Sequence, residues 1–281
     1  MSELGAALHA WLADASAHDR GLRRFGARHH RYRLAPPLPA ARLDAIEAEL
    51  GLRLPSEYRG LVAEVGDGGA GPYHGLMPLD HPVQRAVAHG EFPLAAAAPG
   101  AGPAELAGRA LYRGVVGLGH VGCGYVAFLV VRGAAAGQVW LDLRGAGEGV
   151  GPIHPDFTSY YRAWIARAAR NQLPDGWVTP GRCALPAALS SYLAGRERAA
   201  GVPPGTLGDD ALRDALGALG PGAIRCAASG DDPFFDADEP IDPCPRCEQM
   251  IENLAARGLG RDRIAPGLPP WPQRPHGSVR A

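Results

Sequence analysis

Apolar side chains recur at helical spacing at the very start of the chain. They are Leu4, Leu8, Trp11 and Leu12. Residues three and four positions apart share one face of an α-helix, so this pattern predicts an amphipathic helix.

A pair of short helices is predicted after the proline-rich run at residues 36–39. Leu43, Ile46 and Leu50 mark an apolar face that ends at Gly51, because glycine takes the left-handed conformation that follows a helix without steric cost. The next helix starts at Pro55, since proline is favoured in the first turn. Its apolar face consists of Tyr58, Leu61, Val62 and Val65.

The pattern changes to that of β-strands further along the chain. Residues 111–118, 125–131 and 138–143 are rich in Val, Leu, Tyr and Trp, and glycine-containing turns separate them. They predict a meander of three antiparallel strands. Apolar residues from Phe157 to Ala168 then return to helical spacing, which predicts a helix that covers one face of the sheet. The fold class is therefore α+β, a mostly antiparallel sheet packed by a helix pair before it and a helix after it.

Composition divides the chain into three regions. Residues 1–35 are predicted as a helix and a basic linker, and residues 36–172 as the α+β domain. Residues 173–281 are rich in Pro and Gly and predict a mainly helical or irregular extension with a disordered tail. The low-complexity tract at residues 95–102 is predicted to be a flexible surface insertion, because it has little apolar surface to bury.

Charge excludes several classes of function. The 281 residues carry 28 positive and 29 negative side chains, so no overall basic field is available to bind nucleic acid. The one basic cluster, residues 23–33, has Phe25 and Tyr32 between its cations like a nucleic-acid patch, but its short length favours a solvated linker. No apolar run approaches the roughly 20 residues of a membrane span, and no leader pattern is seen at the start. We expect a cytoplasmic protein with no membrane partner.

The helix pair carries a distinctive string of residues. Residues 43–58 read LDAIEAELGLRLPSEY: an acidic amphipathic helix, Gly, Leu-x-Leu-Pro, two residues and Tyr. Residues 61–69, LVAEVGDGG, continue it into a glycine turn. This order resembles the opening of SUKH (Smi/Knr-type) domains. Residues 75–79 resemble the first strand of that family, residues 117–131 its glycine-broken strand pair, and residues 157–164 its closing helix. The likeness covers about residues 37–170.

The resemblance implies a non-enzymatic binding platform with no catalytic residues. Bacterial members of the family are immunity proteins that neutralise polymorphic or contact-dependent toxins, so the expected partner is a protein, a toxin domain. The expected partner-binding residues are Asp67, Gly68, Gly69 and Tyr73 in and beside the glycine turn. The residues themselves show no Walker loop and no nucleophile elbow, which agrees with the absence of an enzyme class.

One motif outside the SUKH-like region indicates metal chemistry. Cys244 and Cys247 in Pro-Cys-Pro-Arg-Cys stand at the start of a predicted helix, a spacing that lets two thiolates share a zinc ion. A structural zinc would add Cys226 and a fourth ligand such as Cys183 or His276. A metal-free segment is the alternative, and no other cofactor is expected.

The same motif is also half of a zinc-deaminase signature. The other half, His-x-Glu, is spelled by His89 and Glu91, so a zinc-dependent nucleotide or nucleic-acid deaminase is a second functional hypothesis. It requires those two side chains to lie beside Cys244. Cys123, between two glycines in a strand turn, is interpreted as a small packing residue.

Overall fold

The computed structural model describes residues 3–170, 184–224, 233–234, 241–255 and 257–263. The predicted disordered tail lies outside these residues. Within them, no helix combines the length and the apolar character needed to cross a membrane.

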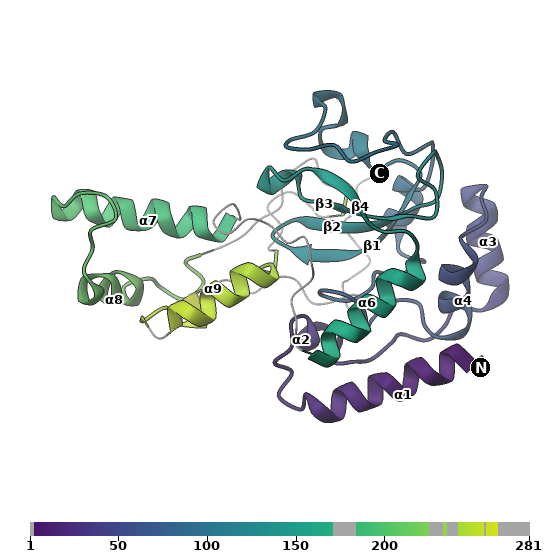
Figure 1. Ribbon diagram of the computed structural model, residues 1–281, viewed down its shortest axis with the longest axis horizontal. Coiled ribbons are helices and arrows are strands. Elements are labelled where there is room, and N and C mark those ends of the chain that lie inside the picture. Colours follow the sequence, from purple (N-terminus) through teal and green to yellow (C-terminus); the bar gives the residue numbers. More distant parts are fainter. Residues whose placement is uncertain (1–2, 171–183, 225–232, 235–240, 256, 264–281) are drawn as a thin grey trace.

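A four-stranded antiparallel sheet forms the centre of the molecule (Figure 1). Its strands follow chain order: β1 (Val115–Gly122), β2 (Tyr125–Val130), β3 (Val139–Asp142) and β4 (Val150–His154). The α+β class and the three predicted strands are confirmed, but the first strand begins at Val115 and not at residue 111, which belongs to a 3-10 turn. β4 was not predicted, because Gly151 and Pro152 interrupt its short apolar pattern.

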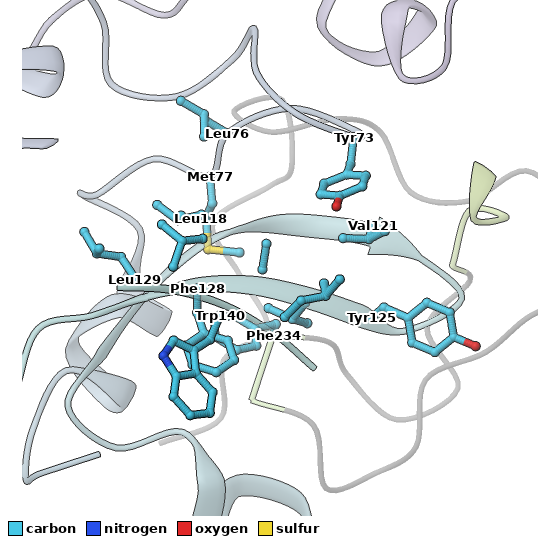
Figure 2. Packing of buried hydrophobic residues seen from close by; sticks show 14 of the residues in the cluster. Tyr73, Leu76, Met77, Leu118, Val121, Tyr125, Phe128, Leu129, Trp140 and Phe234 are labelled. Atoms are coloured by element: carbon cyan, nitrogen blue, oxygen red, sulfur yellow. The ribbon is translucent and has the colours of Figure 1, made fainter. Parts of the chain in front are cut away.

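One face of the sheet is covered by aromatic side chains. Phe128 of β2 lies opposite Trp140 of β3, and Figure 2 shows the two rings together. Phe92, from the long segment between α5 (Pro82–Val87) and β1, packs against both, with ring centroids 5.5 and 4.9 Å away. Phe234 also lies on this face, so close to Gly117 that a Cβ there would meet its ring at 2.4 Å. A residue of the C-terminal region thus belongs to the core of the sheet.

Helices pack beside the sheet as the apolar patterns predict (Figure 1). The pair is α3 (Ala40–Leu50) and α4 (Ser56–Glu64), and Gly51 ends α3 with a φ of 61°. α6 (Phe157–Arg170) follows the sheet, and its Phe157 ring lies 5.0 Å from that of Tyr58. Tyr58 is 2 % exposed, so the tyrosine of the Leu-Pro-x-x-Tyr string is a core residue.

A buried carboxylate explains the acidic residue of the same string. Glu47 is 3 % exposed and accepts hydrogen bonds from the Leu54 N–H at 2.9 Å, Arg53 Nη1 at 2.8 Å and Arg59 Nε at 3.2 Å. Burial alone would raise the pKa of Glu47, but these donors outweigh it and lower that pKa. The carboxylate therefore ties the link between α3 and α4 to both helices.

The expected strand at residues 75–79 is not formed. Gly75 has a φ of 107°, and Pro78 has no N–H to donate, so a regular ladder cannot run through this segment. Met77 nevertheless donates its N–H to the Leu118 carbonyl at 2.7 Å, on the outer edge of β1. The segment thus protects an edge strand without becoming a strand itself.

The basic stretch after α1 (Glu3–His18) is built into the core and is not the solvated linker that we predicted. Ala27 and His30, in α2 (Ala27–His30), are 0 and 5 % exposed, and Tyr32 is 6 % exposed. The Tyr32 hydroxyl donates to Asp19 at 2.8 Å. The small and aromatic residues between the arginines supply enough buried surface to hold the segment down.

The low-complexity tract at residues 95–102 is also fixed at one point. Ala98 and Val150 exchange both backbone hydrogen bonds, at 2.8 and 2.9 Å. The tract is therefore not the wholly flexible insertion that we predicted, because its backbone extends the sheet next to β4.

The described part of the C-terminal extension is helical. Its helices are α7 (Ala184–Ala200), α8 (Asp209–Gly217) and α9 (Pro245–Ala255). Figure 1 shows α7 and α8 projecting away from the sheet, whereas α9 lies nearer to it. Short 3-10 turns complete the described structure: η1 (Ala104–Leu106), η2 (Gly108–Leu111), η3 (Arg144–Ala146) and η4 (Arg261–Arg263).

Candidate functional site

Three cysteine sulfurs gather where the C-terminal extension meets the sheet. Cys123, Cys244 and Cys247 place their Sγ atoms within 4.8 Å of one another. Cys123 lies at the tip of the β1–β2 hairpin, the tip that joins Val121 to Tyr125 in Figure 2. Its Sγ is 3.5 Å from that of Cys247, far beyond the ~2.05 Å of a disulfide. Three thiols in this arrangement can share one metal ion.

The glycines around Cys123 make this approach possible. Gly122, Cys123 and Gly124 have φ angles of 96, 54 and 78°, a left-handed run that a non-glycine residue rarely enters. A Cβ on Gly122 would lie 2.4 Å from the Pro243 carbonyl oxygen. Cys123 donates its N–H to the Asp242 carbonyl at 2.8 Å and accepts the Cys244 N–H on its sulfur at 3.3 Å. The hairpin tip and the Pro-Cys-x-x-Cys segment are thus complementary in shape and pack closely together.

Helix α9 begins within the cysteine motif. Cys244 precedes its first residue and Cys247 lies in its first turn, where the positive end of the helix dipole favours negative charge. The two side chains are 0 and 1 % exposed. If both thiols lost their protons here, the buried negative charges would need a positive partner, which a zinc ion would supply.

A second group of metal-ligating side chains stands on the other side of Pro243. His29, His74 and Asp242 bring one ligand atom each within 4.8 Å of one another. His29 Nδ1 lies 3.7 Å from Asp242 Oδ2, and His74 Nε2 donates to the Pro243 carbonyl at 3.2 Å. The His74 ring stacks on that of His120 at 4.6 Å. Burial lowers the pKa of His74 well below its usual range, so its ring is neutral.

A pocket of ≈ 590 Å³ opens beside the two groups. Arginines of the basic stretch line one side of it and acidic residues of α9 line the other. Its walls include Arg23, Arg24, Arg28, His29, His74, Glu248 and Glu252. The pocket therefore joins the N-terminal and C-terminal regions and offers both signs of charge to a ligand or partner.

The predicted metal residues are only partly brought together. Cys244 and Cys247 share the cluster, whereas Cys226, Cys183 and His276 lie outside the described residues. Cys123, which we interpreted from the sequence as a packing residue, completes the group. The feature of the sequence that indicates a role for Cys123 is its position between two glycines, because a turn of this kind leaves the sulfur open to backbone donors.

The two halves of the deaminase signature are far apart. The His89 carbonyl accepts the Gly114 N–H at 3.0 Å, just before β1, whereas Cys123 follows the end of that strand. An eight-residue strand spans ~26 Å at about 3.3 Å per residue. His89 and Glu91 are both exposed at that end of the sheet. They do not share a site with the three cysteines.

The four residues expected to bind a partner are buried. Asp67 and Tyr73 are 6 and 7 % exposed, and Gly68 and Gly69 are buried with them. Gly69 packs against the backbone of Arg33 and Leu34, and the Tyr73 carbonyl packs directly onto Gly26. The chain's own N-terminal stretch thus covers the glycine turn, so a partner reaches that turn only if the stretch moves.

The carboxylate of Asp67 gives this turn a distinct dependence on pH. It accepts the Leu79 N–H at 2.6 Å and the Asp80 N–H at 3.3 Å, but burial raises its pKa to about 6. In the folded protein the carboxyl group of Asp67 stays protonated up to about pH 6, whereas in the unfolded chain it loses its proton near pH 3.8. The contribution of Asp67 to stability is therefore lost as the pH rises from about 4 to about 6.

The difference in unfolding free energy between wild type and Asp67→Asn should change by about 2 kcal/mol from pH 4 to 7. Urea unfolding at both pH values measures it, and a constant difference would contradict the expectation.

No protein-family model matches the chain, and comparison with curated proteins and with solved structures finds no match either.

Proposed function

We propose that this chain is a non-enzymatic protein-binding module of the SUKH type, an immunity protein that neutralises a toxin domain. The proposal is carried by the order and use of the elements that bear the resemblance. The helix pair with its buried Glu47 and Tyr58, the antiparallel sheet and the closing helix that begins at Phe157 follow each other in the order that the resemblance implies, although residues 75–79 form no first strand. These signature residues stabilise the core of the fold, so residues on the surface can differ according to the partner that is bound.

The pocket beside α9 is the contact surface that we propose for this partner. The glycine turn is covered by residues 26–35, whereas Arg23 and Arg28 are exposed at the edge of the pocket. Exposed arginines of this kind bind carboxylates through two parallel hydrogen bonds, and arginine is enriched at interface hot spots. An acidic patch on the toxin domain is the complement that they favour.

The test is direct binding between the purified full chain and the product of any toxin gene found beside its own. We expect binding that Arg23→Glu/Arg28→Glu weakens at least 10-fold at physiological salt, because the acidic patch then meets like charge. Arg198→Glu, an exposed arginine on α7 outside the pocket lining, is the matched control and should leave affinity unchanged. Co-expression of wild type or Arg198→Glu with the toxin should restore the growth of cells, and co-expression of Arg23→Glu/Arg28→Glu should restore it less. Absence of binding, together with turnover of a small molecule by the purified chain, would refute the proposal.

A second function is favoured by the three gathered sulfurs. We propose that Cys123, Cys244 and Cys247 hold a structural zinc ion, with Cys123 in addition to the cysteine pair that the sequence indicates. Thiolate is the preferred ligand of zinc in structural sites, and these sites are tetrahedral. Cys226 is the candidate for the fourth ligand. The ion would fasten the start of α9 to the tip of the β1–β2 hairpin and so keep one wall of the pocket in place.

A further inference from the structure

One ring nitrogen of the buried His74 has no hydrogen-bond partner among the residues that the structure describes. The side chain is 2 % exposed, and its Nε2 must carry the proton, because it faces a carbonyl acceptor on Pro243. Nδ1 then has only a lone pair to offer, and it has no hydrogen-bond partner in the described part of the chain. A buried acceptor left in this state costs free energy. The lone pair needs a donor or a cation.

His74 also belongs to a group of side chains that could hold a metal ion. His29, His74 and Asp242 form a set of two imidazoles and one carboxylate whose ligand atoms lie within 4.8 Å of one another. Two ligands held ~2.0–2.1 Å from a tetrahedral ion stand ~3.3 Å apart, and His29 Nδ1 is 3.7 Å from Asp242 Oδ2. A small movement of side chains would close the set around an ion.

We propose that His29, His74 and Asp242 form a metal site for a divalent transition-metal ion, separate from the three cysteines. The Pro243 carbonyl fixes the tautomer and orientation of the His74 ring, which is the usual role of a group behind a metal-bound histidine. Two imidazoles and a carboxylate suit iron(II), cobalt(II) and zinc.

Among the residues that the structure describes, the site has three protein ligands, the number found in an open metal centre. Structural zinc is closed by four protein ligands, whereas three protein ligands leave a position for water or a small anion. His29 and His74 both line the pocket, whose walls also include arginines, so an ion held by them would lie beside that cavity. Asp242 is two residues from Cys244, which places the two metal groups on either side of Pro243. The inference stands whether or not the cysteines bind zinc.

Titration of the metal-free full chain with Co²⁺ tests the proposal. Cobalt bound to thiolates gives an intense sulfur-to-metal absorption in the near ultraviolet, whereas cobalt on imidazole and carboxylate gives only weaker visible bands. We expect one equivalent without the sulfur band, in addition to any equivalent that has it. Asp242→Asn and His29→Gln should each weaken the equivalent without the sulfur band at least 10-fold and leave the sulfur band unchanged.

The variants are chosen so that a folding defect does not obscure the result. His29 and Asp242 side chains are 19 and 13 % exposed, so their replacement disturbs the core less than that of His74. His89→Ala, an exposed histidine at the other end of β1, is the matched control and should bind like wild type. Thermal melts of each variant report whether it folds. The proposal is overturned if all bound cobalt shows the sulfur band, or if folded Asp242→Asn and His29→Gln bind as much cobalt as wild type.

Discussion

Cys244→Ser is expected to remove zinc from the purified chain and to make its stability insensitive to chelators. Zinc that binds only the folded state stabilises it by about 4 kcal/mol when the free ion exceeds its dissociation constant about 1,000-fold. The sulfurs of Cys123, Cys244 and Cys247 lie within 4.8 Å, and loss of one thiolate leaves too few ligands for a closed site. We expect zinc affinity to fall at least 100-fold, with a corresponding fall in the melting temperature.

Alanine variants separate metal binding from packing. Cysteine also behaves as a small apolar residue, and if the three sulfurs merely pack, Cys244→Ala should cost only about 1 kcal/mol and respond to no chelator. If they hold zinc, Cys244→Ala and Cys123→Ala should lose zinc as fully as the serine variant does. Metal analysis of each purified variant decides between the two outcomes. Cys226→Ser and Cys183→Ser then identify the fourth ligand by the same measurement.

The periodic parts of the fold were predictable because their signal is local. The helical spacing of Leu43, Ile46 and Leu50 is sufficient to define α3, and Gly51 marks its end. The three strands of residues 111–143 have the same advantage, since β-branched and aromatic residues alternate with glycine turns. β4 is different, because only its register with β3 makes Val150 and Pro152 part of a sheet.

The candidate site depends on contacts between distant parts of the sequence. Cys123 and Cys244 are 121 positions apart, and His74 meets Pro243 across 169 positions, so no spacing rule joins them. The burial of the expected partner-binding residues depends on contacts of the same kind. The glycine turn is buried by Arg33 and Leu34, and nothing local in either segment indicates that the two would pack together. The sequence indicates which residue types could bind a metal, but it does not indicate which of these residues lie close together in the fold.

Gln84→Leu is expected to lower the free energy of unfolding by on the order of 4 kcal/mol, because the side chain of Gln84 completes an edge of the sheet. Gln84 is fully buried on α5. Its amide donates to the Gly117 carbonyl at 2.9 Å and to the Pro78 carbonyl at 3.2 Å, and its oxygen accepts the Gly117 N–H at 2.8 Å. β1 is the edge strand, so these bonds replace those of a missing neighbouring strand. Leucine fills the space but removes the partner of the Gly117 N–H and of the Gly117 carbonyl, whereas the Pro78 carbonyl keeps the His81 N–H.

Two further variants test this account of Gln84 by urea unfolding. Gln84→Glu keeps the shape but loses both donors when ionised, so its stability should recover partly as the pH falls and the carboxyl group regains a proton. Gln138→Leu is the graded control, since the partly exposed Gln138 accepts one bond, from Trp140 Nε1 at 3.0 Å, and should cost about 1 kcal/mol. Equal losses for the two leucine variants would show that the edge of β1 does not depend on Gln84. A larger loss of unfolding free energy for Gln84→Leu would show that the side chain of Gln84 stabilises the outer edge of β1 in place of a fifth strand.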